Sequence, residues 1–176
     1  MLEIKRISTK HEHYSYLENL MQTAFPLEER RNNYLQREFT DNHPLFICNL
    51  ISNQENPVGL ITYWDVDTFY YIEHFAIDSQ IRNMGYGKRT LSLLKGFLHK
   101  PIVLEVEVPN DELTRKRISF YQSQGFHLHD SFPYLQPPYR EEDNWLPLKL
   151  MSYGKEYTTE ELEKCKDKIH KNVYGV

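Results

Sequence analysis

The spacing of apolar residues in the first quarter of the chain predicts a strand followed by two helices. A short strand is expected over residues 2–7. The spacing Thr9-x-x-Glu12 resembles a capping box and predicts a helix start at Thr9, with apolar residues following at helical intervals as far as Pro26. Pro26 should end that helix, and a more polar helix is predicted over residues 27–39.

The pattern then changes to strand-like runs and finally to alternating strands and helices. Three runs with short connections after a turn at 41–44 predict an antiparallel meander. The alternation that follows is typical of a parallel or mixed sheet with crossover helices. A cap at Thr158-x-x-Glu161 predicts a helical tail over 158–173. The predicted strands are 44–52, 58–66, 69–78, 102–108, 126–130 and 146–153, and the predicted helices among them are 88–99 and 112–124.

Composition narrows the class of protein. The 176 residues contain no visible repeat or linker, so a single domain is expected. The 21 Lys and Arg against 25 Asp and Glu give a net charge of −4, which argues against a general nucleic-acid partner. No segment has the apolar length of a signal peptide or a membrane span, and the two cysteines form no C-x-x-C pair. A cytoplasmic protein with no membrane partner is therefore expected.

A glycine-containing loop between a predicted strand and a predicted helix is the most informative segment. Glycines let the backbone approach a ligand, and the unpaired N–H groups at a helix start favour an anion. A Walker loop would need Gly where Arg82 stands, and a dinucleotide fingerprint would need a small residue where Thr90 stands, so both patterns fail. An ordinary glycine turn is the alternative. The loop reads Ile81-Arg82-Asn83-Met84-Gly85-Tyr86-Gly87-Lys88.

Two motifs resemble those of the GNAT superfamily of acetyl-CoA-dependent N-acetyltransferases. Arg82-x-x-Gly85-x-Gly87 is similar to its pyrophosphate loop, and the segment 119–126, SFYQSQGF, is similar to its second motif. Their order and separation also match, over about residues 1–153. Many members carry Asn and Ala where this chain has Thr114 and Arg117, so the contact to CoA that the Asn makes would fall to Thr114.

The resemblance implies a fold and a cofactor site. The expected fold is α/β, a mixed sheet of six to seven strands flanked by helices, with an antiparallel N-terminal meander and a parallel central pair splayed at the cofactor. Residues 1–176 would form one N-acetyltransferase domain, with a core of 1–153 and the helical tail. Acetyl-CoA would be the cosubstrate, and no metal is expected. The residues implied to bind it are Phe75, Ala76, Ile77, Arg82, Asn83, Met84, Gly85, Tyr86, Gly87, Lys88 and Thr114.

Acetyl transfer to an amine needs a base, because an ammonium with a pKa of about 10.4 must lose a proton near neutral pH. Glu73 lies in the strand before the loop, and the family often places a Glu base there. Glu73 is therefore the preferred base, against the alternative of an exposed or salt-bridged strand carboxylate. Glu105, on the strand predicted next to it, is the competing candidate.

The departing CoA thiolate needs a proton donor, and Tyr121 matches the general acid of the family. The alternative for Tyr121 is a purely structural core aromatic. Direct attack on the thioester is expected, without a covalent enzyme intermediate, and a backbone N–H near Phe75 would stabilise the oxyanion.

The acceptor is expected to be an amine, and the protein a monomer or homodimer. By resemblance, the loops at 26–31 and 134–143 would border the acceptor site. Their acidic and aromatic residues suit a cation, although such loops can also be plain solvated surface. Two alternatives remain open: a non-catalytic acyl-CoA sensor or interaction module on the same fold, and a phosphate-binding module for another nucleotide.

Overall fold

The computed structural model describes all residues from Met1 to Val176, and their contacts group into two compact units. The first unit comprises Met1–Asp65 and Ile72–His99, and the second comprises Val66–Tyr71 and Lys100–Val176. The chain passes between the units three times, once within each of the strands β3 (Asn56–Val66) and β4 (Phe69–Ile77) and once before β5. The single-domain expectation is left untested by this grouping.

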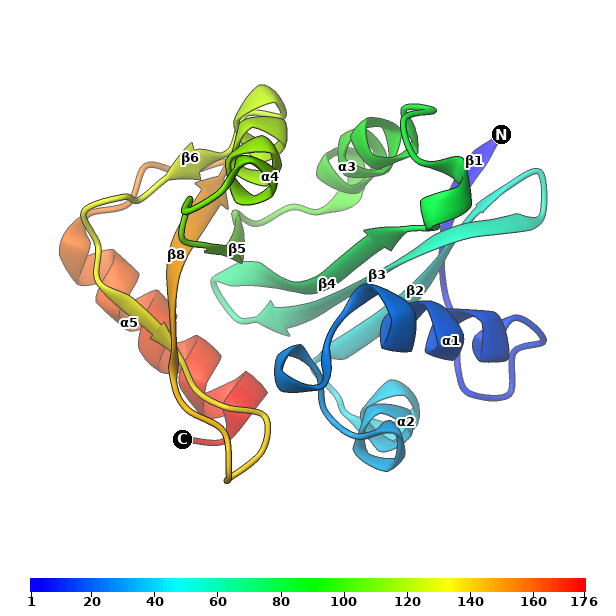
Figure 1. The fold of residues 1–176 in the computed structure, drawn as a ribbon, viewed down its shortest axis with the longest axis horizontal. Coiled ribbons are helices and arrows are strands. Elements are labelled where there is room, and N and C mark those ends of the chain that lie inside the picture. The colour runs from blue at the N-terminus through cyan, green and yellow to red at the C-terminus, as the bar shows by residue number, and fades with distance from the viewer. The chain divides into compact units, whose positions relative to one another are not determined.

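The first unit contains the predicted meander. Strands β1 (Leu2–Arg6), β2 (Phe46–Asn53) and β3 pair antiparallel in that order, and β4 follows β3. Figure 1 draws helix α3 (Tyr86–Phe97) on one side of this sheet and the helices α1 (Tyr14–Ala24) and α2 (Asn33–Asn42) on the other. Both the helices and the strands of this unit contribute fully buried side chains, among them Leu17, Leu60, Trp64, Leu91 and Leu94.

The predicted helix start at Thr9 is wrong. Helix α1 begins at Tyr14, and its N-cap His13 makes no side-chain capping bond. Thr9 instead bonds a distant side chain: its backbone N–H donates to Asp41 Oδ1 at 2.9 Å and its hydroxyl donates to Oδ2 at 2.5 Å. The capping-box pattern fails because Thr9 forms hydrogen bonds with Asp41, 32 positions away, instead of capping a helix.

The helix predicted over 27–39 is also shifted. A single 3-10 turn, η1 (Leu27–Glu29), comes first, and Asn32 then caps α2 by accepting a hydrogen bond from the Leu35 N–H at 2.8 Å. Helix α2 continues through Asn42, where the sequence predicts a turn. The residues between η1 and α2 are therefore an extended connection, and Arg31 lies in it.

The second unit is built on β8 (Leu146–Tyr153), which pairs antiparallel with β5 (Ile102–Glu107), β6 (His127–Leu128) and β7 (Tyr134–Gln136). Helix α4 (Glu112–Ser123) packs against β5 and β6. Within this unit the Tyr70 N–H donates to the Pro101 carbonyl oxygen at 2.8 Å, so β4 and β5 start side by side and in the same direction. The α/β class with a mixed sheet and flanking helices is thus confirmed.

The structure has eight strands rather than the expected six to seven, because the Pro- and Tyr-rich segment contains one. Strand β7 is only three residues long and is followed by two prolines, so no alternating pattern marks it. Its residues Tyr134 and Gln136 are buried against β8.

The tail forms helix α5 (Thr159–Ile169), and the predicted capping box at Thr158 and Glu161 is confirmed. A π-helical turn, η3 (His170–Tyr174), continues it. Leu162, Cys165, Ile169 and Val173 are buried on one side. Figure 1 draws α5 and α4 on opposite sides of β8. No helix of the structure combines the length and the apolar character needed to cross a bilayer.

Candidate active site

The loop between β4 and α3 adopts the backbone geometry of an anion cradle. Asn83 and Gly85 both have left-handed conformations, with φ of +66° and +78°. Gly85 is the N-cap of α3, and it offers no side chain to bond the first helical N–H groups. The first hydrogen bond of the helix runs from the Arg89 N–H to the Gly85 carbonyl oxygen at 3.1 Å. The N–H groups of the preceding turn therefore have no partner inside the helix.

Positive charge surrounds these N–H groups. Arg82, Lys88 and Arg89 are all exposed, and no acidic residue lies in the first turn of α3. The helix dipole adds to this field, so a phosphate at this exposed loop would be favoured by about 0.3–1 kcal/mol from the dipole alone. Arg82 to Gly85 and Lys88 are exposed, whereas Tyr86 and Gly87 are half-buried, and binding of a pyrophosphate by this segment stays a prediction.

Strand β4 presents alternate backbone groups to opposite edges. The N–H of His74 donates to Thr62 Oγ1 at 3.2 Å and the N–H of Asp78 donates to the Val58 carbonyl oxygen at 2.9 Å, so both point toward β3. Since successive N–H groups of a strand alternate, those of Phe75 and Ile77 point away from β3. This is the orientation that a pantetheine arm would need for bonding to these two residues.

A glycine allows β3 to approach this part of β4 closely. A Cβ atom on Gly59 would lie 2.5 Å from the Ala76 carbonyl oxygen and 2.9 Å from Ile77 Cδ1. Any side chain at this position would therefore push against the backbone of the predicted pantetheine segment.

Glu73 is enclosed in a charged network within the first unit. Its side chain has no exposed surface, and both oxygens accept from the Arg31 guanidinium, whose side chain is 3% exposed. The indole N–H of Trp64 donates to Glu73 Oε2 at 2.9 Å. Arg31 also donates to Gln36 Oε1 at 2.8 Å. The residue Glu73 is nevertheless partly exposed, so its main chain carries that exposure.

Aromatic rings complete the surroundings of Arg31. Its Cζ lies 4.8 Å from the ring centre of Phe39, 5.6 Å from that of Phe46 and 5.8 Å from that of Trp64. The sequence points to none of these partners, because Arg31 and Glu73 are 42 positions apart. A Glu in a buried strand does signal that hydrogen-bond donors or a countercharge must lie close to it.

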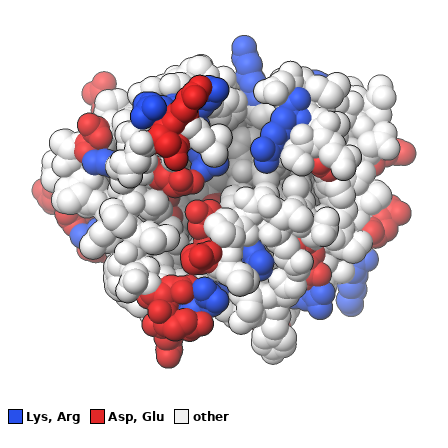
Figure 2. Space-filling view, in the orientation of Figure 1, with Lys and Arg blue, Asp and Glu red and all other residues white.

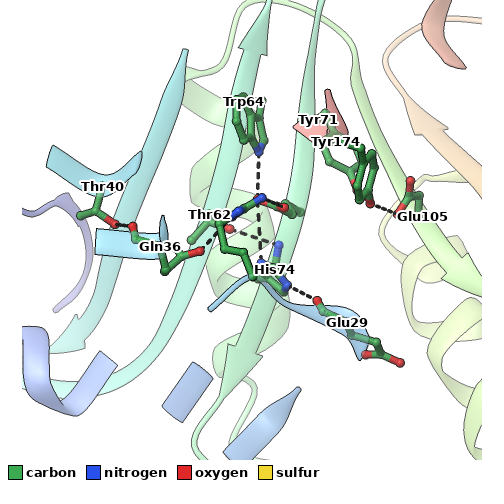
Figure 3. A network of polar contacts seen from close by, with 11 residues as sticks. Glu29, Gln36, Thr40, Thr62, Trp64, Tyr71, His74, Glu105 and Tyr174 are labelled. Atoms are coloured by element: carbon green, nitrogen blue, oxygen red, sulfur yellow. Dashed lines mark hydrogen bonds and ion pairs between the residues drawn. The ribbon is translucent and has the colours of Figure 1, made fainter. Parts of the chain in front are cut away.

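The electrostatics of this network keep Glu73 ionised. Burial raises the pKa of its carboxyl group, but the Arg31 charge, His74 and the donated hydrogen bonds together hold that pKa below its ordinary value. Burial in turn lowers the pKa of His74, which is neutral near pH 7. The His74 Nε2–H donates to the Glu29 carbonyl oxygen at 2.7 Å, as Figure 3 shows. The segment 29–31 is thereby tied to β4 through two adjacent residues.

Glu105, the competing base candidate, has partners of a different kind in the second unit. The hydroxyl groups of Tyr134 and Tyr174 each donate to one of its oxygens, the latter at 3.0 Å. The hydroxyl groups of Tyr174 and Tyr71 lie 3.3 Å apart, and Figure 3 shows Tyr71 and Tyr174 beside Glu105. The sequence gives no sign that the C-terminal segment contributes to this cluster.

Tyr121 is buried on α4, between the rings of Phe120 at 5.3 Å and Phe126 at 5.5 Å. Burial raises its pKa to about 12, partly offset by Arg117, so the phenol keeps its proton at neutral pH. No hydrogen bond acts on this hydroxyl group. The hydroxyl proton of Tyr121 is therefore not donated to another group of the protein.

Thr114 serves as a capping residue of α4. Its N–H donates to Asp111 Oδ1 at 2.8 Å, while its hydroxyl group accepts from the Asp111 N–H and donates to the Asp111 carbonyl oxygen. Thr114 is 4% exposed. Its contact to CoA stays a prediction, and its hydroxyl group already has partners in the protein.

Charges on the surface are mixed in sign. On the face drawn in Figure 2, acidic and basic side chains are interspersed among uncharged ones. In the predicted acceptor loop of the second unit, Arg140 is bound by Asp143 at 2.8 Å and lies 3.8 Å from Glu142. No cluster of three or more His, Cys, Asp or Glu residues is arranged to hold a metal ion.

The fold is that of an α/β protein in which a glycine-containing loop joins a strand to a helix N-terminus. Residues 13–126 match the model of the acetyltransferase (GNAT) family. This match covers more than half of the chain, and the chain therefore belongs to the GNAT acetyltransferase family.

Individual relatives agree with this family. A solved chain from Bacteroides thetaiotaomicron, assigned to the GNAT acetyltransferases, is 46% identical, with 99% of each chain covered and a TM-score of 0.95. A Bacillus subtilis (strain 168) protein assigned as acetyltransferase YjbC is 28% identical over 116 residues, which are 62% of this chain. The match spans only 56% of that protein.

A more distant structure shares the fold alone. The GNAT family acetyltransferase from Elizabethkingia anophelis, solved with acetyl-CoA bound, is 14% identical. The match covers 88% of this chain and 98% of the Elizabethkingia chain, with a TM-score of 0.59.

Proposed function

We propose that this protein transfers the acetyl group of acetyl-CoA to a primary amine of a small molecule or peptide. The observation that carries the proposal is the exposed loop Arg82–Lys88 at the start of α3, with left-handed residues at Asn83 and Gly85 and no acidic neighbour in the helix turn. Membership of the GNAT family and the acetyl-CoA bound to a relative of the same fold support acetyl-CoA as the ligand.

The cofactor would be held by backbone groups and by the loop. The pyrophosphate would bind the N–H groups at the start of α3, with Arg82 and Lys88 adding positive charge. The pantetheine arm would bond the backbone groups of Phe75 and Ile77, which point away from β3. A single backbone N–H near Phe75 would stabilise the oxyanion.

The reaction would proceed by direct attack. The amine nitrogen, once deprotonated, bonds the thioester carbonyl carbon, and the carbon–sulfur bond breaks as the oxyanion collapses. We assign protonation of the CoA thiolate to Tyr121, whose hydroxyl group keeps its proton and makes no hydrogen bond. The base is a carboxylate, and Glu73 and Glu105 are the two hypotheses to be separated by substitution.

A non-catalytic acyl-CoA sensor is the second candidate, and it is favoured only by the occupation of Thr114 in a helix cap. Such a sensor would bind acetyl-CoA without acetylating any amine. The expectations of a cytoplasmic location and of a monomer or homodimer stay predictions.

Calorimetric titration of acetyl-CoA tests the cofactor site. Gly85→Glu places bulk and negative charge in the cradle and should abolish binding. Gly96→Glu makes the same change near the other end of α3, where a Cβ meets nothing within 4 Å, and should retain binding. Binding that survives Gly85→Glu unchanged would contradict the placement of the pyrophosphate.

An amine panel with thiol release as the readout then tests turnover. Acetylation of at least one polyamine, aminoglycoside or peptide amine is expected. Tight binding of acetyl-CoA with no thiol release from any amine would support the sensor. Binding of ATP or NAD, without binding of acetyl-CoA, would indicate a module for another nucleotide.

A further inference from the structure

The loop that leads from β4 to α3 has a backbone conformation that needs support from its surroundings. Asn83 has a φ of +66° and Gly85 a φ of +78°, and a left-handed conformation is unfavourable for residues other than glycine. Such a conformation persists only where the surrounding structure fixes it. Because residues 82–85 are exposed, we looked for the contacts that fix the loop at its two ends.

The end next to β4 is fixed through Asp78, which follows the last residue of the strand. Its Oδ1 accepts from the Gln80 N–H at 3.0 Å and caps the 3-10 turn η2 (Ser79–Ile81). Its backbone N–H donates to the Val58 carbonyl oxygen at 2.9 Å. Arg82, the first residue of the predicted pyrophosphate loop, comes directly after this turn. The course of the loop therefore depends on where Asp78 is held.

The other carboxylate oxygen of Asp78 is bound by helix α1. The Tyr16 hydroxyl donates to Asp78 Oδ2 at 3.1 Å, across 62 positions of the chain. Both residues are half-buried, and burial together with Asp78 raises the pKa of Tyr16, so its hydroxyl group stays protonated and remains a donor. Tyr16, Asp78 and the loop all belong to the first unit. The bond ties the loop to the helix layer on the side of the sheet opposite to α3 (Figure 1).

The end next to α3 has a weaker anchor. Tyr86 is the first residue of this helix, and its hydroxyl group accepts from Asn53 Nδ2 at 3.3 Å. Asn53 is the last residue of β2. The loop thus lies between one anchor on a carboxylate and one on a neutral amide, and a hydrogen bond to a charged group is the stronger kind.

We propose that Tyr16 is a positioning residue that holds Asp78, and with it the loop 82–88, in the arrangement that binds the pyrophosphate of acetyl-CoA. This inference rests on the proposed function. Tyr16 acts through Asp78 and makes no contact with the cofactor. Its hydroxyl group raises the fraction of molecules in which the N–H groups of the loop converge, and the apparent affinity for acetyl-CoA scales with that fraction.

The test is calorimetric titration of acetyl-CoA into Tyr16→Phe. This change keeps the ring and removes the donor to Asp78, so the loop samples other arrangements and the Kd for acetyl-CoA should rise about fivefold to tenfold. In the free protein, the amide NMR resonances of Gly85 and Gly87 should also shift. A uniform loss of stability would not move these two resonances.

The matched control is Tyr14→Phe, the same change two positions earlier on α1. Groups on α1, α2 and β2 influence the Tyr14 hydroxyl, and Asp78 is not among them. Its affinity for acetyl-CoA and its Gly85 and Gly87 resonances should be those of the wild type. Asn53→Ala, at the weaker anchor, should raise the Kd only about twofold.

Asp78→Ala separates positioning from charge. If Asp78 acted only through its negative charge, removing that charge near the loop would tighten binding of the anionic cofactor. The positioning role predicts the opposite sign, a rise in Kd of at least about tenfold, because the cap of η2 and the bond to α1 are both lost. In the Asp78→Ala background, Tyr16→Phe should have no further effect, since Tyr16 acts through this carboxylate.

Distinct outcomes separate this inference from the proposed function. If the wild type binds acetyl-CoA and Gly85→Glu does not, an unchanged Kd in Tyr16→Phe would overturn the inference and leave the proposed cofactor site standing. Unshifted Gly85 and Gly87 resonances in Tyr16→Phe, additive losses in the double variant, or tighter binding by Asp78→Ala would also overturn the inference. A folded wild type that does not bind acetyl-CoA would overturn the proposed function and this inference together.

Discussion

Two carboxylates in this protein are both fixed by hydrogen bonds, yet their surroundings suit them to opposite tasks. Glu73 neutralises a buried cation and ties the segment 29–31 to β4. Glu105 accepts hydrogen bonds from the phenols of Tyr134 and Tyr174, and the terminal turn of the chain provides the latter. The difference teaches that the identity of the partner, rather than burial alone, decides whether a carboxylate is suited to hold structure or to move protons.

The largest expected effect is on stability. Glu73→Gln leaves the Arg31 guanidinium buried without its countercharge and should lower the free energy of unfolding by about 3–5 kcal/mol. Urea unfolding at pH 7 measures this loss. Glu105→Gln should lose less, because it leaves neutral phenols behind.

An exposed pair provides the matched control for this comparison. Glu18 is bonded twice by Arg37, whose side chain is 55% exposed. Glu18→Gln should have a far smaller effect than Glu73→Gln. Equal losses in the two variants would contradict the structural role assigned to Glu73.

The next largest effect is on turnover and concerns Tyr121, a buried phenol whose hydroxyl group bonds neither a cation nor another phenol. Tyr121→Phe keeps the ring between Phe120 and Phe126 and removes a hydroxyl group that makes no hydrogen bond. We expect kcat to fall roughly 100-fold, as for loss of a general acid, with little change in unfolding free energy. Steady-state kinetics together with thermal unfolding measures both. Unchanged kcat would mean that Tyr121 is a core aromatic only.

A backbone change sharpens the role of β4. Gly59→Ala brings a Cβ to 2.5 Å from the Ala76 carbonyl oxygen, so the strand must shift. We expect a loss of about 1–3 kcal/mol in unfolding free energy and weaker acetyl-CoA binding. Gly96→Ala, in the open part of α3, should instead stabilise the protein by about 0.5–1 kcal/mol. Unaltered acetyl-CoA affinity in Gly59→Ala would argue against contact of the pantetheine with this segment.

The smallest effect is the pH dependence of stability near the Glu73 network. The pKa of His74 is lowered in the folded protein, so the unfolded chain binds more protons at mildly acidic pH. Its contribution to stability is present above about pH 6.5 and is lost as the pH falls toward the folded value. His74→Gln should reduce the slope of unfolding free energy against pH by up to about 1.4 kcal/mol per pH unit.

Other histidines share the sign of this effect, since burial lowers the pKa of His43, His129 and His170 too. The wild-type slope between pH 7.5 and 5.5 should therefore exceed that of His74→Gln without vanishing in the variant. Identical slopes would mean that His74 is not held neutral by its burial.

Local patterns account for what the sequence could predict. The Thr158 cap, the alternation in β4 and the loop from Arg82 to Lys88 are each set by residues within a few positions of one another. The resemblance to a known family supplied the order of elements and the candidate acid. The left-handed conformation of Asn83 is not fixed by the residue type, because asparagine tolerates this region but occupies it in only a minority of cases.

Long-range pairing accounts for what the sequence could not predict. Asp41 takes Thr9 away from the predicted cap, and Arg31 reaches Glu73 across 42 positions. Tyr174 reaches Glu105 across 69 positions. No periodicity encodes such a partner, because the pairing depends on which elements pack together. The salt-bridged alternative for Glu73 was visible in the sequence, but its cation was not.

The pH profile of kcat/KM, measured in parallel for the wild type, Glu105→Gln and Glu73→Gln at a temperature where all three are folded, tests the account most directly. We predict that one of the two carboxylate variants loses the acidic limb and at least about 100-fold in kcat/KM, which identifies the base, while the other keeps the limb. An acidic limb that persists in both variants would contradict a carboxylate as the proton acceptor.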